Sequence, residues 1–373
     1  MKPISEMVGL HVFEAVFIVS AILLLLSALQ RNFVTSLALF SIVYFAYTVI
    51  RKKAAKFLKT EGKYVLITGC DSGFGHGLAK YLDDLGFNVF ATCLHENGTG
   101  ANELKNINSD RLHVLQMDVG KDESVTGCLQ KVEQMCGNTG LWGIVNNAGI
   151  NFVGDIEFCT MKQYLDIGNV NMYGMVRVTK AFLPLVRQTK GRIVNVTSCK
   201  GRIALPYDSA YGITKYGGEA FSDILRLEMK RFGIKTSIIQ PGNYGGITGC
   251  LNEEGQARIK NDLDVMWNNA SEEIREVYGR EYHDSFCRAI ESGARTTSPT
   301  IQPVLEAFKD ALLNVEPETR YLIPGGNQWF DVFCMFAILN GLLPTCIMDK
   351  LMDRQFLQRR PLPRQLQTKS KTD

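Results

Sequence analysis

Short apolar runs alternate with longer amphipathic stretches through most of the chain. The runs that predict buried β-strands occupy residues 64–68, 88–92, 111–117, 142–145, 192–197, 235–240 and 320–323. Between them, stretches such as residues 76–86 and 123–135 carry apolar positions at helical spacing. Continuous apolar strands separated by helices are typical of a parallel sheet covered on both faces. The pattern therefore predicts an α/β chain with a doubly wound parallel sheet.

The first sixty residues have a different character. Residues 9–29 and 33–50 are almost wholly apolar, and each run is close to the length that a helix needs to cross a bilayer. The basic cluster from Arg51 to Lys59 predicts that the chain beyond it stays on the cytoplasmic side. A cleaved signal peptide is the alternative, but no small-residue cleavage site stands out. We expect residues 1–60 to be a membrane anchor of two transmembrane helices.

The C-terminal region, residues 327–373, is expected to hold an apolar helix and a basic tail. Residues 329–348 are strongly apolar around Asp331. This stretch fits either a helix that caps the main domain or a segment that dips into the membrane surface.

Composition narrows the classes of function. The 373 residues are 46% hydrophobic and 21% charged, which suits a chain that buries a large core. A net charge of +3 is too small to indicate a nucleic-acid partner. The ten cysteines include no CxxC pair and the five histidines form no ligand-like cluster. We therefore expect reduced thiols and no metal site.

The first strand of the main domain runs directly into a glycine-rich turn. Gly69, Ser72, Gly73 and Gly75 stand between that strand and the helical stretch at residues 76–86. Glycines at these positions permit a tight turn and let backbone amides at the helix start approach a pyrophosphate. A strand before the turn and a helix after it make this a candidate dinucleotide site.

A second set of reactive side chains surrounds the strand at residues 192–197. Ser198 follows this strand, and Tyr211 and Lys215 share one face of the next helix because they are four positions apart. A phenol loses its proton near pH ~10, and a cation a few ångströms away favours the phenolate. We interpret the three residues as a device that moves a proton on or off a carbinol while a hydride leaves or arrives.

A purely structural interpretation competes with this one. Tyrosine and lysine at this spacing occur together by chance, and a serine at a strand end is commonly a cap or turn residue. The catalytic interpretation is favoured because every motif falls at the carboxyl end of a predicted strand, where such sheets bind ligands.

Together these motifs resemble the short-chain dehydrogenase/reductase superfamily. The resemblance rests on TGCDSGFG at residues 68–75, Asp118, NNAG at residues 146–149, Asn171, Ser198, Tyr211 and Lys215. It covers residues 62–325 and implies a Rossmann-type domain over residues 61–326. RLHVLQMDV and PLPRQL are similar to the membrane-anchored branch with the type 2 17β- and 11β-hydroxysteroid dehydrogenases. TGCDSGFG and YGITKYGGEAFSDILRLEM are equally similar to the 3-hydroxybutyrate and retinol dehydrogenases.

The resemblance assigns a role to each catalytic residue. It makes Tyr211 the proton donor or acceptor, with Lys215 lowering the pKa of the phenol and binding the nicotinamide ribose. It implies that Ser198 orients the substrate oxygen. It also implies that Asn171 holds a water molecule that links Lys215 to solvent.

The resemblance also implies a nucleotide site along the strand ends. The implied contacts are Gly69, Ser72, Gly73 and Gly75 with the pyrophosphate, Asp118 and Val119 with the adenine, Asn146 on the adenosine side, and Pro241, Gly242 and Thr248 with the nicotinamide. Thr248 stands further from Pro-Gly than is usual in the family, which puts its contact in question.

The choice of nucleotide depends on the end of the second strand, Thr92 to Glu96. This segment has no arginine to accept a 2′-phosphate, and its acid, Glu96, comes slightly late. We expect NAD, with NADP as the alternative. With NAD the working direction is alcohol oxidation.

The substrate class is inferred from residues 243–300, a long insertion where this fold usually builds its lid. The apolar side chains of this insertion either line a pocket or form a core: Met266, Trp267, Tyr278, Tyr282 and Phe286. A lipophilic secondary or allylic alcohol, of the steroid or retinoid class, suits a membrane-held enzyme with such a lid. A short hydroxy acid is the alternative, with Lys200 and Arg202 as its carboxylate clamp rather than as solvated loop charges.

Three expectations remain. A catalytically silent membrane-bound binding protein is the non-enzymatic alternative, and the intact set of candidate catalytic residues argues against it.

We expect the protein to lie in the endoplasmic reticulum membrane, with the catalytic domain facing the cytosol, and the mitochondrial membrane is the alternative. The family resemblance implies a homo-oligomer.

Overall fold

A computed structural model of the chain describes residues 39, 41–43, 56–294, 296–326, 331–358 and 360–369. The chain divides into two compact units: Met1–Leu58 with Asn314–Glu316, and Lys59–Leu313 with Pro317–Asp373. The predicted transmembrane segments, residues 9–29 and 33–50, lie outside the described residues except for 39 and 41–43. None of the helices in the described ranges combines the length and apolar character that a bilayer crossing requires.

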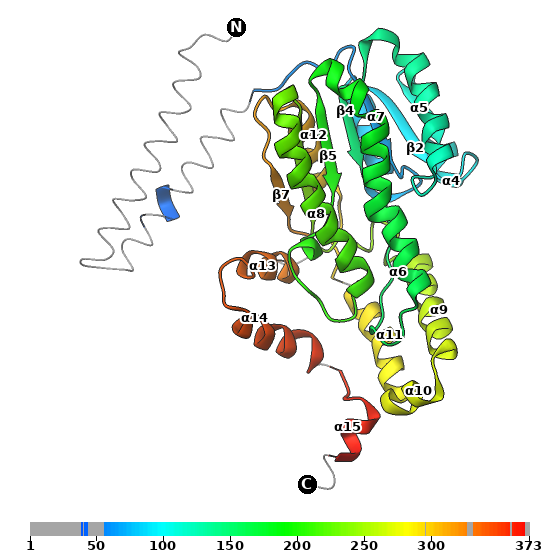
Figure 1. The fold of residues 1–373 in the computed structure, drawn as a ribbon, viewed down its shortest axis with the longest axis vertical. Helices are drawn as coiled ribbons and strands as arrows, with labels where there is room; N and C mark the ends of the chain where they lie inside the picture. Colours follow the sequence, from blue (N-terminus) through cyan, green and yellow to red (C-terminus); the bar gives the residue numbers. More distant parts are fainter. Residues whose placement is uncertain are drawn as a thin grey trace. The chain divides into compact units, whose positions relative to one another are not determined.

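The second unit is built on a seven-stranded sheet in which all neighbouring strands are parallel (Figure 1). The strands are β1 (Tyr64–Thr68), β2 (Asn88–Cys93), β3 (Leu112–Gln116), β4 (Gly143–Asn146), β5 (Arg192–Val196), β6 (Lys235–Pro241) and β7 (Arg320–Ile323). Their order is β3-β2-β1-β4-β5-β6-β7, so the winding reverses between β1 and β4. The predicted strands and the doubly wound α/β class are confirmed.

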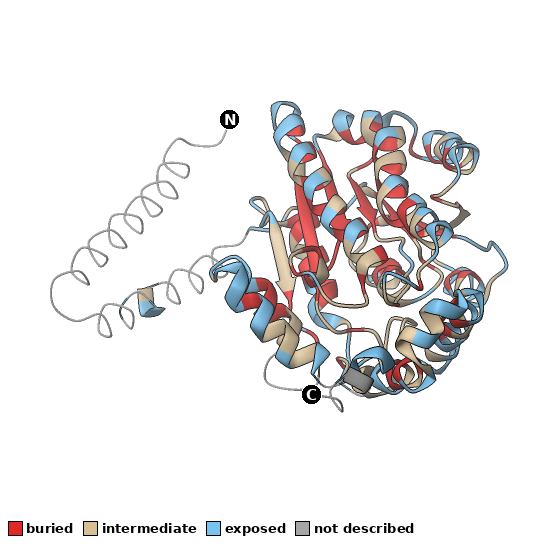
Figure 2. Cartoon of the chain, turned by 60° about the horizontal axis from the view of Figure 1, so that its bottom comes forward, coloured by how far each residue is buried: buried red, intermediate tan, exposed pale blue. Residues whose placement is uncertain are grey.

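Helices cover both faces of the sheet. One face carries α5 (Asp122–Cys136), α7 (Met175–Thr189) and α8 (Ser209–Met229), and the other carries α3 (Gly73–Asp84) and α12 (Gln302–Leu313). Successive strand side chains point to opposite faces, so Leu66 joins the core under α5, α7 and α8, while Val65 lies on the side of Leu312. Figure 2 shows the central strands buried between these layers, whereas most residues of the edge strands β3 and β7 are of intermediate burial.

Shorter elements complete the main domain. They are α4 (Thr99–Lys105), η1 (Gly137–Thr139), α6 (Met161–Gly168), η2 (Asn169–Gly174), η3 (Cys199–Gly201) and η4 (Lys230–Phe232). A capping box of Thr160 and Gln163 starts α6. The π-helical turn η2 then leads from α6 directly into α7.

The insertion after β6 folds into α9 (Glu253–Asn269), α10 (Glu272–Tyr278) and α11 (Arg280–Ala294). Its buried residues Ile259, Leu263, Met266, Trp267 and Phe286 form a separate apolar cluster with Phe158, which lies between β4 and α6. After β7 come α13 (Val332–Leu339), α14 (Thr345–Met352), η5 (Asp353–Leu357) and α15 (Arg364–Lys369). Helices α13 and α14 pack with Cys199 and Ile203, just after β5, so the apolar C-terminal stretch caps the main domain.

Candidate active site

Ser198, Tyr211 and Lys215 meet at the carboxyl end of β5. The hydroxyl of Ser198 caps η3 by accepting the N–H of Lys200 at 3.2 Å. Tyr211 and Lys215 lie on one face of α8, and Lys215 Nζ is 5.2 Å from the centre of the Tyr211 ring. The Ser198 hydroxyl donates to the Pro241 carbonyl at 3.4 Å and lies close enough to Tyr211 to influence the pKa of the phenol. The structure thus brings together the three residues that the sequence grouped.

Burial dominates the electrostatics of this group. It raises the pKa of Tyr211 well above the usual value, Cys250 and Asp208 add to the rise, and the nearby Ser198 hydroxyl opposes it. Burial also lowers the pKa of Lys215 to about 8, although Cys250 and Glu219 oppose this change. The expected lowering of the phenol pKa by Lys215 is therefore not found. The Tyr211 phenol and the Lys215 ammonium thus lie close together, but burial disfavours the charged form of each.

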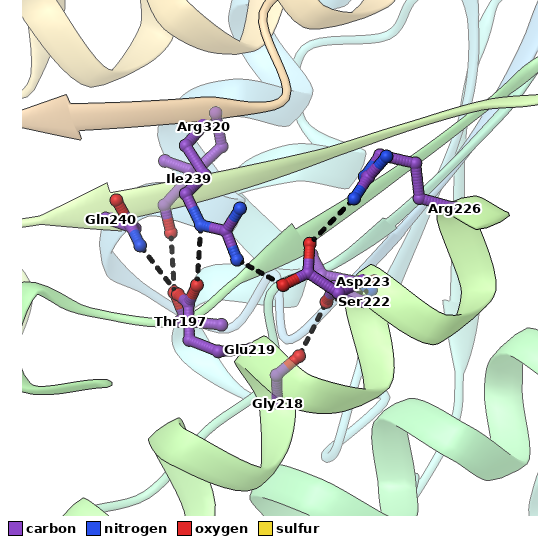
Figure 3. Close-up of polar contacts among 10 residues, drawn as sticks. Thr197, Gly218, Glu219, Ser222, Asp223, Arg226, Ile239, Gln240 and Arg320 are labelled. Atoms are coloured by element: carbon purple, nitrogen blue, oxygen red, sulfur yellow. Dashed lines mark hydrogen bonds and ion pairs between the residues drawn. The ribbon is translucent and has the colours of Figure 1, made fainter. Parts of the chain in front are cut away.

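A buried polar network holds α8 against the sheet below Lys215 (Figure 3). The carboxylate of Glu219, one turn after Lys215, accepts from the Thr197 hydroxyl, from Gln240 Nε2 at 2.8 Å and from Arg320 Nε at 3.1 Å. These donors stand at or after the ends of β5 and β6 and on β7, so one carboxylate ties the catalytic helix to three strands. Sequence analysis missed Glu219, and a lone acid on a helix gave no signal for it.

Asn171 lies in η2 and is almost fully buried. Its Oδ1 accepts the N–H of Ile150 at 2.8 Å, and its Nδ2 donates to the Ile150 carbonyl at 2.9 Å and to Thr214 Oγ1 at 3.2 Å. Isolated π-helical turns are frequent at functional sites. Asn171 braces the loop after β4 against the residue that precedes Lys215, and its water-holding role stays a prediction.

The glycine-rich turn between β1 and α3 is held by Asn147. Gly69 and Gly73 have φ angles of +70° and +62°, which favour glycine. A Cβ on Gly75 would lie 2.3 Å from the Gly69 carbonyl oxygen and 2.5 Å from Asn147 Nδ2. Asn147 Nδ2 donates to the carbonyls of Thr68 and Gly69 at 2.8 and 3.1 Å. Sequence analysis missed this role, although its signal, the NNAG motif, was in view.

The carboxylate of Asp71 lies at the carboxyl end of β2. It accepts the N–H of Leu94 at 3.0 and 2.9 Å and the N–H of His95 at 3.3 Å. After burial, it is the main cause that raises the pKa of Cys93, the last residue of β2. Dinucleotide-binding sheets read the adenosine ribose at this edge. The turn after β1 thus brings a carboxylate to this edge, which the segment Thr92 to Glu96 was expected to provide.

Three predicted adenosine contacts have side chains engaged elsewhere. Asp118 accepts the N–H two residues later at 2.9 Å, and Val119 is buried in the core under α7. Asn146 ends β4, but its amide donates to Thr179 Oγ1 at 2.9 Å and to Asn195 Oδ1 at 2.8 Å. The Asn146 side chain therefore lies in the core rather than at the ligand edge, because this strand position faces α7.

Thr248 and Pro241 border the same edge from the other side. Pro241 ends β6, and its carbonyl accepts the Ser198 hydroxyl at 3.4 Å. A Cβ on Gly73 would lie 3.0 Å from the Thr248 carbonyl oxygen, so Thr248 reaches the glycine-rich turn despite its long spacing. Its hydroxyl bonds a carbonyl of its own turn at 3.0 Å. Ser72, the exposed residue before α3, makes no side-chain capping bond.

Asp331 organises the loops after β6 and β7. Its carboxylate accepts the N–H groups of Asn243 at 2.8 Å, Gly325 at 2.9 Å and Phe333 at 2.8 Å. A Cβ on Gly242 would lie 2.2 Å from Asp331 Oδ2. The backbone at residue 242 can therefore approach the Asp331 carboxylate only because this residue is glycine. One buried acid therefore fixes the Pro-Gly segment and starts α13, a role that sequence analysis missed.

The lid residues divide between core and cavity. Met266, Trp267 and Phe286 are buried in the apolar cluster of the insertion, and Tyr282 and Phe286 line a small cavity beside it together with Arg360. The Arg360 guanidinium is 4.2 Å from the ring centre of Tyr207, 4.3 Å from Tyr282 and 4.7 Å from Phe286. Because the cavity has room for about one water molecule, these observations favour the core interpretation, and a substrate pocket stays a prediction.

Lys200 and Arg202 lie in or just after η3. Lys200 forms an ion pair with the buried Asp208 at 2.5 Å, so it is not a solvated loop charge. Arg202 lies near α13, where its carbonyl accepts a hydrogen bond from Asn340 Nδ2 at 2.8 Å.

Within the described ranges no cluster of ligand side chains could hold a metal ion.

The sheet and its site define a nucleotide-dependent oxidoreductase, and sequence comparison identifies the family. The model of the family described as short chain dehydrogenase matches residues 63–259, more than half of the chain. The protein belongs to the short-chain dehydrogenase family and is an oxidoreductase that acts on alcohols. The residues fit a dinucleotide, because the turn leaves no room for a side chain at Gly75 and Asp71 offers an acceptor at the ribose edge.

The chain is similar to dehydrogenases of different names. It is 45% identical to bovine mitochondrial D-beta-hydroxybutyrate dehydrogenase over 275 residues, 73% of this chain and 79% of that protein. It is 44% identical to rat retinol dehydrogenase 7 over 78% of this chain and 87% of that one. It is 40% identical to human 17-beta-hydroxysteroid dehydrogenase type 6 over 79% of this chain and 89% of that one.

A solved structure supports the fold. The structure of a short-chain dehydrogenase from Streptomyces avermitilis aligns with a TM-score of 0.54 at 21% identity, covering 80% of this chain and 97% of that one. At this identity the likeness concerns the fold alone.

Proposed function

We propose that the protein oxidises a lipophilic secondary or allylic alcohol, of the steroid or retinoid class, with NAD. The observation that carries the proposal is the meeting of Ser198, Tyr211 and Lys215 at one strand end. The nicotinamide supplies the hydride acceptor when it is bound. Everything else in the step depends on the side chains of this chain.

Tyr211 takes the carbinol proton. The Ser198 hydroxyl, which lies near the phenol, orients the substrate oxygen and stabilises the phenolate as it forms. Because burial raises the pKa of Tyr211, the phenolate needs a positive charge nearby, and the Lys215 ammonium is the cation 5.2 Å from the ring centre. Asn171 supports this group by fixing the turn of α8 that carries Lys215.

The proposed preference for NAD rests on Asp71. Its carboxylate can accept a hydrogen bond from a ribose 2′-hydroxyl and repels a 2′-phosphate at the end of β2. Asp71→Ser should lower the preference for NADH over NADPH, expressed as the ratio of their affinities, by about tenfold or more. A fluorescence titration without substrate measures both affinities. An unchanged ratio would remove Asp71 as the basis of the preference.

The proposed substrate class rests on the apolar lid and on relatives named retinol and hydroxysteroid dehydrogenases. The relative named D-beta-hydroxybutyrate dehydrogenase favours the second candidate, a short hydroxy acid. NADH formation by membranes given NAD with steroid alcohols, retinol or 3-hydroxybutyrate separates the two. Tyr211→Phe is the matched control, and equal turnover by this variant would contradict the enzymatic mechanism.

We also propose a membrane contact. The apolar residues 9–50 would insert, and exposed side chains on and after α13, such as Ile338 at 52% and Leu342 at 73%, would touch the bilayer surface. The endoplasmic reticulum is the proposed membrane, and the mitochondrial membrane is the alternative suggested by one relative's name. A homo-oligomer is the proposed assembly. Flotation with liposomes tests the contact, and Leu342→Glu should weaken it.

A further inference from the structure

The ion pair of Lys200 and Asp208 stands beside the candidate catalytic tyrosine. Lys200 Nζ is 2.5 Å from Asp208 Oδ2 and 5.5 Å from the centre of the Tyr211 ring. The Asp208 side chain is 6% exposed, whereas the Lys200 side chain is 26% exposed and can be approached. The pair is thus a buried acid covered by a partly accessible cation.

Asp208 is the N-cap residue of α8, but its side chain does not cap the helix. It is the residue before α8, where an aspartate normally accepts N–H groups of the first turn, but its carboxylate makes no such bond. Within the described part of the chain, Asp208 Oδ1 is buried and has no hydrogen-bond donor. A buried acceptor without a donor is unfavourable, so the site is complementary to a group that brings one.

The pair lies between the carbinol site and the lid. Asp208 is three residues before Tyr211 on the chain, and it bridges to Gly154, whose missing Cβ would meet Met266 of the lid cluster at 3.1 Å. Asp208 therefore connects the start of the helix that carries Tyr211 with a residue that touches the lid cluster.

We infer that Lys200 and Asp208 form a polar subsite that reads a second hydroxyl on the substrate and rejects a free carboxylate. This inference rests on the proposed function. A hydroxyl donates to Asp208 Oδ1 and accepts from the Lys200 ammonium, so it satisfies both partners. A carboxylate brings no donor, and the charge of Lys200 is already balanced by Asp208. The subsite therefore favours lipophilic diols over hydroxy acids.

The test compares secondary alcohols that share one apolar skeleton, with and without a second hydroxyl, and 3-hydroxybutyrate. The wild type should prefer the diol in kcat/KM by about 10- to 100-fold. Asp208→Asn should lose most of this preference and raise kcat/KM for 3-hydroxybutyrate by about tenfold, because Lys200 then carries an unbalanced charge. Lys200→Met should also lose the preference for the diol, but its kcat/KM for 3-hydroxybutyrate should not rise.

The matched controls come from an exposed ion pair on α6, Lys162 with Asp166 at 2.6 Å. Lys162→Met and Asp166→Asn should leave all ratios unchanged. If Asp208→Asn lowers turnover of every substrate by one common factor while NADH still binds, the pair is structural and the inference is wrong.

A binding measurement separates this inference from the proposed function. If the wild type oxidises none of the alcohols, the proposed function fails. The subsite is then judged by thermal shift, in which the diol must stabilise the wild type more than the mono-alcohol does, and Asp208→Asn must abolish that difference. Equal shifts for both alcohols would overturn the subsite.

Discussion

The guanidinium of Arg320 on β7 donates to the buried carboxylate of Glu219 on α8 at 3.1 Å, across 101 positions of sequence. Glu219 stands one helical turn after Lys215 and raises the pKa of that lysine. The last strand of the sheet therefore holds the carboxylate that favours the charged form of Lys215.

Glu219→Gln should shift the pH profile of turnover. Glu219 opposes the burial that lowers the Lys215 pKa to about 8, so its neutralisation lets that pKa fall further. The ammonium is then lost at a lower pH, and the alkaline limb of kcat/KM moves toward acid. The free energy of unfolding should also fall by about 1–3 kcal/mol, because Arg320 loses a charged partner. Glu228→Gln, exposed on the same helix, is the control. A lower melting temperature with an unmoved pH profile would contradict the electrostatic role.

Lys215→Met should separate stability from activity. Below pH 8 the ammonium is protonated in the folded and the unfolded chain, and only folding buries it. Removing the charge should raise the free energy of unfolding by about 1–3 kcal/mol at neutral pH while turnover falls by about 100-fold or more.

The advantage of Lys215→Met should shrink as pH rises from about 8 to 10.5. Over that range the unfolded wild type binds more protons than the folded one, so the wild type gains stability. Urea unfolding across pH measures this. A variant that is less stable than the wild type at every pH would contradict the prediction.

Gly75→Ala should weaken nucleotide binding. The new methyl group would lie 2.3 Å from a backbone carbonyl that cannot move freely, so the turn must shift. We expect NADH affinity to fall about tenfold or more and the free energy of unfolding to fall by about 2 kcal/mol. Gly127→Ala is the control, because nothing lies within 4 Å of the new methyl in α5, and it should stabilise by about 0.5–1 kcal/mol. Calorimetry measures both, and equal effects would disprove the steric explanation.

Asp331→Asn should loosen the loops after β6 and β7. One oxygen becomes an amide donor that faces backbone N–H groups, so bonds to residues such as Asn243 or Phe333 are lost. The free energy of unfolding should fall by about 2–4 kcal/mol and the KM for NAD should rise. Asp349→Asn, exposed on α14, should change neither. Steady-state kinetics that show an unchanged KM would separate Asp331 from the nucleotide site.

Periodicity and strand-end position were enough to place the sheet and the central site. The strands were predicted because each buried run is short and apolar, and Ser198, Tyr211 and Lys215 were grouped because strand ends of a parallel sheet converge. These signals are local in the sequence or follow from the regular geometry of the fold.

The remaining site residues depend on contacts that sequence spacing does not encode. Asp71 serves the end of β2 from the turn after β1, and Asp331 binds loops from beyond β7. The family resemblance placed Asn146 on the adenosine side, but the pleat turns its side chain into the core. The raised pKa of Tyr211 follows from the depth of burial, which no spacing reveals.

Arg360 makes the end of the chain a part of the lid. Its guanidinium lies between the rings of Tyr207 and the lid residues Tyr282 and Phe286. Shortening the chain before Arg360 would therefore leave those aromatic rings facing an empty space. Trimming the protein before Arg360 for expression would therefore also remove the cation that packs on these three rings.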